Sequence, residues 1–310
     1  MSWPDCTAAP TVGASVTLDM ADHTTTDATL GAVLELPDER LTMNTLAILG
    51  GGKLGEALLS GLLRAGRSAD DIVISEKHEE RATFLAQTYG VRATGVQLAM
   101  GIASTVVLAV KPQDIDVLLE QIRPHVGSSH VVISVAAGIT TARLERGLGA
   151  DIPVVRCMPN TPALVDEAMT AICAGAFAQA IHLELADSLL STVGKVVRVP
   201  ESQLDAVTAL SGSGPAYFFF LVEAMIDAGI LLGLPRELAA QLIVQTAVGS
   251  AKMLRDSGEH PVQLREAVTS PAGTTIAAIR ELEKHGVRAA ILAAVEAASL
   301  RSAALGRAVD

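Results

Sequence analysis

The chain has 310 residues, of which half are hydrophobic and 18% are charged, so it can bury a large core and exceeds one average domain. Its formal net charge of −11 argues against nucleic acid as a partner, because neutralising phosphates requires a basic face. The three cysteines, Cys6, Cys157 and Cys173, lack CxxC spacing, which fits a reducing cytoplasm, and no set of Cys, His and acidic residues has metal-site spacing.

Residues 1–41 are rich in Thr, Ala and Asp without periodicity, and we expect them to form a poorly ordered N-terminal extension. From Met43 onward, short runs that are apolar along their whole length alternate with helical patterns. The expected strands are Thr45–Leu49, Asp71–Ser75, Thr105–Val110, His130–Val135 and Pro153–Cys157, and the expected helices start at Leu54 and cover Glu79–Thr88 and Gln113–Ile122. This alternation predicts an α/β domain over 42–200, a Rossmann-type doubly wound parallel sheet covered on both faces.

The strand pattern stops near Pro200, and residues 201–310 are expected to form an all-helical C-terminal domain. Helices are expected at Leu204–Leu210, Ala216–Leu232, Arg236–Leu254, Pro261–Val268, Thr274–His285 and Val287–Leu305. The stretch Ala216–Leu234 is apolar enough to suggest a membrane span, but Glu223 and Asp227 lie in its middle and no basic flank follows. A buried or interface helix is therefore favoured, and no membrane partner is expected.

The glycine turn Gly50–Gly55 (GGGKLG) lies between an apolar strand and an amphipathic helix. In the dinucleotide fingerprint, Gly50 would permit the tight turn, Gly52 would let the pyrophosphate approach the backbone, and Gly55 would let helix and strand pack closely. The helix N-terminus, with Lys53 and Leu54 in its first turn, offers free N–H groups to phosphates. A plain glycine turn is the alternative, but the strand that follows favours nucleotide binding.

The second expected strand ends in Ser75, Glu76 and Lys77, at the place where Rossmann domains select their dinucleotide. An acidic residue there holds the ribose hydroxyls of NAD, whereas a hydroxyl or a cation nearby accommodates the phosphate of NADP. Glu76 therefore indicates NAD, while Ser75, Lys77 and Arg81 indicate NADP. The residues alone leave the choice open.

Two loops precede helices in the second half of the chain. Ser211–Pro215 (SGSGP) has the serine and proline of an ordinary helix start, and no serine in it has glycine at both −2 and +2, which excludes a hydrolase nucleophile elbow. In the second loop, Ser270 and the N–H groups of Gly273, Thr274 and Thr275 could bind a carboxylate, although a plain helix cap is an equal alternative. Lys111, at the carboxyl end of an expected strand, is placed to contact a cofactor.

From about Met43 to Arg307 the chain resembles the pyrroline-5-carboxylate reductase family, and the resemblance is carried by ordered blocks. The blocks are AVKP (Ala109–Pro112), VAAGIT (Val135–Thr140), RCMPNTP (Arg156–Pro162), DAVTALSGSGPAYFF (Asp205–Phe219) and VTSPAGTT (Val268–Thr275). The sequences SGSGPAY and SPAGTT are the most specific of these. The residues before Met43 have no counterpart in the resemblance.

The resemblance implies reduction of the C=N bond of 1-pyrroline-5-carboxylate to L-proline by hydride transfer, with NADP(H) as the expected cofactor and NAD(H) as the alternative. It implies substrate contacts from Ser213, Ser270, Gly273, Thr274 and Thr275, with the Thr275 hydroxyl at the ring nitrogen as the catalytic group. The implied cofactor contacts, besides the glycine turn and Ser75–Lys77, are Ala109, Val110, Lys111, Pro112, Ala137 and Asn160. It also implies helical domains that interlock into homodimers, sites that take loops from both chains, and larger rings of dimers.

Three positions depart from the family pattern. Ala272 stands where a second glycine is usual, Glu76 where a small or basic residue is common, and Gln97 where an asparagine is common. A different enzyme on the same scaffold would be expected to carry a catalytic lysine or acid on the helices, and a non-enzymatic dinucleotide sensor would not need the two loops. Because both loops are present, the reductase is favoured over these alternatives.

Overall fold

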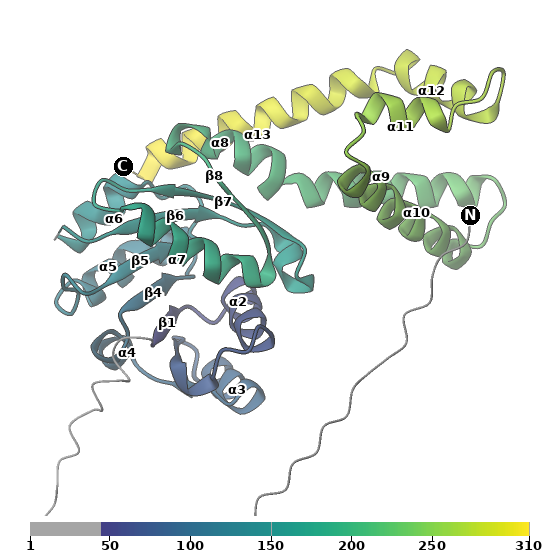
Figure 1. Ribbon diagram of the computed structural model, residues 1–310. Coiled ribbons are helices and arrows are strands. Elements are labelled where there is room, and N and C mark those ends of the chain that lie inside the picture. The colour runs from purple at the N-terminus through teal and green to yellow at the C-terminus, as the bar shows by residue number, and fades with distance from the viewer. Residues whose placement is uncertain (1–44, 150, 310) are drawn as a thin grey trace, which may run out of the picture. The chain divides into compact units, whose positions relative to one another are not determined.

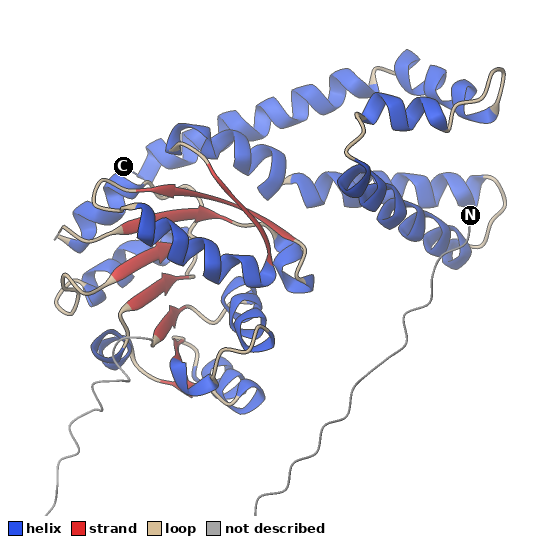
Figure 2. Cartoon of the chain, viewed as in Figure 1, coloured by secondary structure: helices blue, strands red, loops and turns tan. Residues whose placement is uncertain are grey.

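The computed structural model of the chain describes residues 45–149 and 151–309 (Figure 1). The expected N-terminal extension, residues 1–41, lies outside the described residues. Within them, an eight-stranded sheet is followed by a series of helices (Figure 2). The strands are β1 (Leu46–Leu49), β2 (Ile72–Ser75), β3 (Arg92–Ala93), β4 (Thr105–Leu108), β5 (Val131–Ser134), β6 (Val154–Met158), β7 (Ala168–Ala174) and β8 (Gly194–Arg198).

The sheet has the strand order β3-β2-β1-β4-β5-β6-β7-β8, and the pairings from β3 to β6 are all parallel. The predicted Rossmann-type fold is therefore confirmed. The order reverses at β1, with β2 on one side and β4 on the other, which creates the topological switch point where such sheets bind ligands. Strands β7 and β8 were not expected; β7 pairs antiparallel with β6 and parallel with β8, so this edge of the sheet is not part of the parallel pattern.

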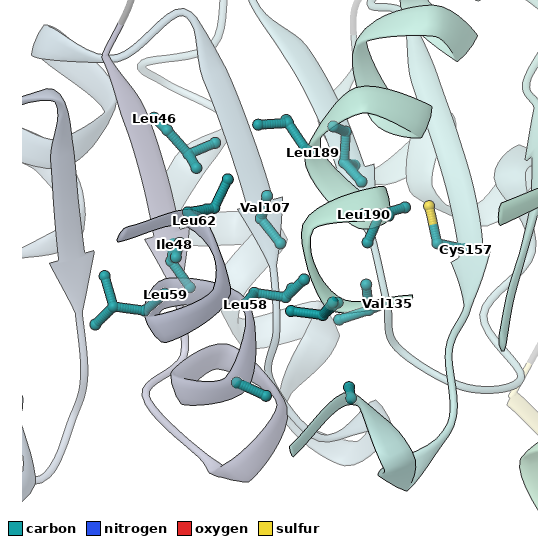
Figure 3. Close-up of a cluster of buried hydrophobic side chains, with 14 of the residues drawn as sticks. Leu46, Ile48, Leu58, Leu59, Leu62, Val107, Val135, Cys157, Leu189 and Leu190 are labelled. Carbon is teal, nitrogen blue, oxygen red and sulfur yellow. The ribbon is translucent and has the colours of Figure 1, made fainter. Parts of the chain in front are cut away.

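Helices cover both faces of the sheet because successive residues of each strand point to opposite sides. Leu46 and Ile48 of β1 belong to one buried cluster, and Ala47 and Leu49 to the other. The first cluster includes buried leucines of α2 and α7 (Figure 3), and the second includes buried residues of α4, α5 and α6. These helices are α2 (Lys53–Arg64), α3 (Glu79–Tyr89), α4 (Val96–Ile102), α5 (Ile115–Ile122), α6 (Thr141–Leu148) and α7 (Ala180–Leu190).

The described chain after β8 is helical, as expected, although the Ser211–Pro215 segment differs from the expected loop. Thr208–Gly212 forms a π-helical turn, η6, and α9 begins at Gly214 rather than Ala216, so that η6 continues almost directly into α9. Ser213 occupies the N-cap position without a side-chain hydrogen bond, which corrects the expectation of an ordinary serine cap. The helices are α8 (Leu204–Val207), α9 (Gly214–Leu231), α10 (Arg236–Ser257), α11 (Pro261–Ala267), α12 (Thr274–Lys284) and α13 (Val287–Val309).

Helices α9, α10, α12 and α13 expose large apolar side chains in the single chain. Phe218, Phe219 and Phe220 are each at least 65% exposed, and Gly214 is the one buried residue that α9 contributes. The expectation that α9 is buried in the core is therefore wrong for the single chain, and the expectation of an interface helix remains. By length and composition alone, the segments Glu201–Leu231 and Val287–Gly306 would also be able to cross a membrane.

A carboxylate joins the first helical turn after β8 to the sheet. Glu201, in the 3-10 helix η5 (Glu201–Gln203), accepts hydrogen bonds from the backbone N–H of Thr141 at 2.8 Å, from its hydroxyl at 2.6 Å, and from Arg156 Nη1 at 2.8 Å. Burial alone would raise the pKa of Glu201, but the hydrogen bonds from Thr141 and Arg156 outweigh it and lower that pKa. The Arg156 side chain is only 8% exposed, so Glu201 compensates a cation that has little access to water.

We expect Glu201→Ala to lower the free energy of unfolding by about 2–3 kcal/mol, because it leaves the buried Arg156 guanidinium and two Thr141 donors without their acceptor. The stabilisation from Glu201 should be fully present above the unfolded-state pKa of about 4.3 and should be lost as the pH falls through the lower folded-state pKa. Urea unfolding of the wild type and the variant at pH 7 and at acidic pH measures both effects.

A matched control is Asp187→Ala, which breaks the more exposed pair between Asp187 Oδ2 and Arg198 Nη2 at 3.4 Å. This variant should lose less than about 1 kcal/mol. Equal losses in the two variants at pH 7 would contradict the role given to Glu201.

Candidate functional site

The glycine loop lies at the carboxyl end of β1, against the loop that follows β4. Gly50 has φ +114°, and a Cβ atom there would stand 2.5 Å from the carbonyl oxygen of Ala109. A Cβ at Gly55 would stand 2.0 Å from the carbonyl oxygen of Gly50, so the first turn of α2 can pack here only as glycine. Gly52, by contrast, has open space beside it and is the N-cap of α2 without a side-chain hydrogen bond. The N–H groups of the first turn of α2 are thus left for a ligand.

A cavity of about 780 Å³ opens beside this loop, at the carboxyl edge of β1, β2 and β4. Its volume lies in the upper part of the range for pockets that bind small molecules, and it opens at the switch point of the sheet. Eight of the residues expected to bind a cofactor line it: Gly50, Gly52, Ser75, Glu76, Lys77, Ala109, Val110 and Lys111. The lining also includes residues that the sequence did not single out, among them His78, Thr94, Gly95, Val96 and Asp114.

The other expected cofactor residues lie outside the lining of this cavity. Lys53, Leu54 and Gly55 form the first turn of α2, and Pro112 begins the 3-10 helix η2 (Pro112–Asp114) directly after Lys111. Ala137 follows β5 and is likewise absent from the lining. Gln97 is exposed on α4, while its neighbour Val96 is the residue that reaches the cavity.

Asn160 lies at the end of β6 and joins the sheet to the π-helical turn. Its Nδ2 donates to the Ser211 carbonyl at 3.3 Å and to the Ser211 hydroxyl at 3.2 Å, and its Oδ1 accepts from the Met169 N–H at 2.9 Å. Asn160 also lines a second, largely apolar cavity of about 520 Å³, formed with Pro162, Leu210, Ser211, Gly214, Pro215, Phe218 and Phe219. Ser213 does not line this cavity, although its neighbours do; its N–H donates to the Thr208 carbonyl at 2.8 Å.

Glu76 extends from the end of β2 back to the glycine loop. Its Oε2 accepts from the N–H of Gly51 at 2.8 Å, and its Oε1 accepts from the N–H of His78 at 2.9 Å. Gly51 is a residue that the fingerprint leaves unspecified, so sequence reasoning passed over it; the run of three glycines is the signal that could have indicated it. The carboxylate is therefore held by two backbone donors beside the cavity.

The loop Ser270–Thr275 turns sharply before α12. Ala272 has φ +57°, in the left-handed region, and the Gly273 N–H donates to the Ser270 carbonyl at 3.1 Å. The Gly273 N–H is therefore engaged within the loop, while the N–H groups of Thr274 and Thr275 belong to the first turn of α12. Neither of the two cavities described above is lined by this loop.

Cysteine and metal chemistry find no support at these positions. Burial raises the pKa of Cys157 well above its ordinary value, and burial together with the nearby Glu201 raises the pKa of Cys173 to about 11, so both thiols are protonated at neutral pH. Among residues 45–149 and 151–309, no group of three His, Cys, Asp or Glu side chains is placed to hold a metal ion.

Each half of the chain matches a known family model. Residues 201–305 match the family model described as pyrroline-5-carboxylate reductase dimerisation, and residues 45–138 match the one described as NADP oxidoreductase, coenzyme F420-dependent. Pyrroline-5-carboxylate reductase of Mycobacterium tuberculosis is 48% identical over 84% of this chain and 96% of its own length. The enzyme of Corynebacterium melassecola is 46% identical over 86% of this chain and 100% of its own.

Solved structures agree with these relatives. The pyrroline-5-carboxylate reductase of Coxiella burnetii superposes with a TM-score of 0.81 at 36% identity, over 85% of this chain and 98% of its own. The pyrroline carboxylate reductase of Plasmodium falciparum, solved with NADP bound, superposes with a TM-score of 0.77 at 29% identity, over 86% of this chain and 99% of its own. With relatives this similar over nearly their whole length, the chain belongs to the pyrroline-5-carboxylate reductase family.

Proposed function

We propose that this chain binds NAD(P)H in the 780 Å³ cavity and reduces 1-pyrroline-5-carboxylate to L-proline, the last step of proline synthesis. The observation that carries the proposal is the glycine loop packed against Ala109 at the switch point of the sheet, in a chain of this family. We assign dinucleotide binding to residues 42–200 and substrate binding and dimerisation to residues 201–310.

The chain's own groups fit a dinucleotide. The open space at Gly52 and the uncapped N-terminus of α2, with Lys53, Leu54 and Gly55, would receive the pyrophosphate. Ser75, Glu76 and Lys77 lie where the adenosine ribose binds in such folds, and Val110, Lys111 and Pro112 follow β4 across the cavity. Ala137 and Asn160 would lie towards the nicotinamide, which supplies the hydride when it is bound.

For the substrate, the family resemblance assigns the carboxylate to the loop before α12. The Ser270 hydroxyl and the N–H groups of Thr274 and Thr275 would bind it, favoured by the partial positive charge at the start of this helix. Gly273 would also contact the carboxylate, in the space that its missing side chain leaves beside Ser270, and Ser213 would contact the substrate as well. The Thr275 hydroxyl would orient the ring nitrogen and help to keep it protonated. A protonated imine is already electrophilic, so positioning and exclusion of water carry most of the rate.

A complete site would combine two chains. The Ser270–Thr275 loop does not line the cofactor cavity of its own chain, and α9, α10, α12 and α13 leave large apolar side chains exposed. Exposed apolar surface on this scale marks an interaction surface, and the dimerisation family model covers these helices. We propose a homodimer in which each site takes the loop from the partner, with rings of dimers as the larger assembly. The dimer would cover the two helices that are apolar enough for a membrane, and we assign the protein to the cytoplasm.

The direct test is NAD(P)H oxidation by the purified protein. Absorbance at the nicotinamide band should fall only after pyrroline-5-carboxylate is added, and L-proline should accumulate in equal amount. A background without substrate, and a reaction with an open-chain keto acid in its place, are the controls. Absence of turnover with both NADH and NADPH would overturn the proposed function.

We expect Thr275→Val to lower kcat by about tenfold to a hundredfold, because it keeps the volume of the side chain and removes the hydroxyl from the ring nitrogen. Cofactor affinity should stay nearly unchanged, since the cavity is lined by other residues. Steady-state kinetics with a fluorescence titration of the dinucleotide measures both quantities. Thr274→Val, at the neighbouring and more exposed position, is the matched control, and an unaltered kcat in Thr275→Val would remove the hydroxyl from the mechanism.

A second variant pair tests the loop before α12. A Cβ at Gly273 would stand 2.3 Å from the Ser270 hydroxyl oxygen, so Gly273→Ala must displace the hydroxyl assigned to the carboxylate. We expect the KM for pyrroline-5-carboxylate to rise about tenfold, the loss of one hydrogen bond to a charged group, with little change in the KM for the dinucleotide.

The matched control is Ala272→Gly, which removes the methyl group from the residue with φ +57°. Relief of the left-handed strain, about 1 kcal/mol, is largely offset by the greater freedom of glycine in the unfolded chain, so both the KM values and the stability should change little. A larger rise in the substrate KM for Ala272→Gly than for Gly273→Ala would contradict this account of the loop.

A further inference from the structure

The acidic residue at the end of β2 is held in place before any dinucleotide binds. Glu76 Oε2 accepts from the Gly51 N–H at 2.8 Å and Oε1 accepts from the His78 N–H at 2.9 Å. From this arrangement we infer that the chain selects NADH over NADPH and that Glu76 is the residue that decides it. The inference rests on the proposed function and names the dinucleotide that the same site takes.

The two backbone donors leave Glu76 able to accept more hydrogen bonds. An ionised carboxylate has about four lone-pair positions, and the backbone uses one on each oxygen. Glu76 also lines the cavity, at the strand end where an acidic residue binds the adenosine ribose hydroxyls in this class of fold. A carboxylate that is already oriented loses little side-chain entropy when the ribose diol donates to it, which favours a dinucleotide with a free 2′-hydroxyl.

Lys77 and Arg81, the two cations that the sequence associated with a 2′-phosphate, already pair with acidic side chains. Lys77 Nζ lies 3.2 Å from Asp114 Oδ2, and both residues line the cavity. Arg81 forms an ion pair with Glu56, and its Nε donates to the Gly51 carbonyl at 2.8 Å. Its guanidinium also rests 5.1 Å from the ring centre of Phe84, so its position is fixed from three sides. A phosphate would have to break these contacts before it gained their charge.

The charge around the cavity acts in the same direction. Three carboxylates, Glu76, Glu79 and Asp114, line it against two lysines, Lys77 and Lys111. A phosphate monoester carries a charge between about −1.5 and −2 at pH 7, so NADPH brings a like charge next to Glu76, whereas NADH brings two hydroxyl donors. Specificity of this kind arises from repulsion of the wrong ligand as much as from attraction of the right one.

This inference reverses the preference for NADP(H) that the sequence suggested. That preference rested on the family resemblance, whereas the residues alone left the choice open between Glu76 for NAD and Ser75, Lys77 and Arg81 for NADP. The structure ties Lys77 and Arg81 to Asp114 and Glu56, and Ser75 is only 8% exposed. Among these residues, Glu76 is thus the one that can still accept hydrogen bonds from a ribose.

The experiment measures both binding and turnover with the two reduced dinucleotides. Calorimetric titration of the wild-type protein without substrate should give a Kd for NADH that is lower than that for NADPH by about tenfold to a hundredfold, and kcat/KM with pyrroline-5-carboxylate should show the same order. A wild-type protein that binds NADPH more tightly, or that binds both equally, overturns the inference. Because binding is measured without substrate, that result is distinct from a failure to reduce pyrroline-5-carboxylate.

The variant Glu76→Ser removes the charge and leaves a shorter side chain that ends in a hydroxyl. We expect the ratio of the NADPH Kd to the NADH Kd to fall at least tenfold, with weaker NADH binding and tighter NADPH binding. Glu80→Gln removes the same charge from an exposed position in the first turn of α3 that does not line the cavity, and it should keep the wild-type ratio. A ratio that falls equally in both variants would assign the preference to overall charge and overturn the role of Glu76.

A second variant guards against damage to the glycine loop, which loses one acceptor in Glu76→Ser. Asp114→Asn removes the negative charge that pairs with Lys77, while the hydrogen bonds from Gly51 and His78 to Glu76 remain. We expect NADPH binding to tighten several-fold and NADH binding to change less. Unchanged NADPH affinity in both Glu76→Ser and Asp114→Asn would overturn the inference.

Discussion

The architecture around the cavity depends on the close approach of backbone segments at the glycine loop, where no side chain separates them. A Cβ atom at Gly55 would stand 2.0 Å from the carbonyl oxygen of Gly50, and one at Gly50 would stand 2.5 Å from the carbonyl oxygen of Ala109. Helix α2 can therefore pack directly against the carboxyl ends of β1 and β4. The same contact aims the uncapped N-terminus of α2 at the switch point of the sheet, where the cavity opens. The shape of the cavity and the packing of the first helix thus depend on the same two missing side chains.

The sequence predicted the part of the fold whose signal is local. Strands β1, β2, β4, β5 and β6 consist mainly of β-branched and aliphatic residues, and a buried parallel sheet leaves that pattern. Strand β7, with the sequence AMTAICA, is rich in alanine, which has low β propensity, so it resembles no strand until its pairing with β6 is known. The π-helical turn Thr208–Gly212 is a second case, since its glycine and serine residues resemble a loop in any sequence pattern.

The candidate site shows the same division. Gly50, Gly52 and Glu76 could be assigned from spacing, because the fingerprint fixes their distance along the chain. The hydrogen bond from Gly51 to Glu76 and the pairing of Lys77 with Asp114 join residues far apart in the sequence, so no local pattern could indicate them. The pairing of these groups with one another therefore decides which charges a ligand in the cavity meets.

The contact between Gly51 and Glu76 also constrains how this enzyme can diverge. A single substitution at position 76 changes a residue that lines the cavity and, at the same moment, removes the acceptor of a loop amide. A change at this position therefore also costs the glycine loop one hydrogen bond. Such coupling links the order of the glycine loop to the charge beside the cavity in any later change at position 76.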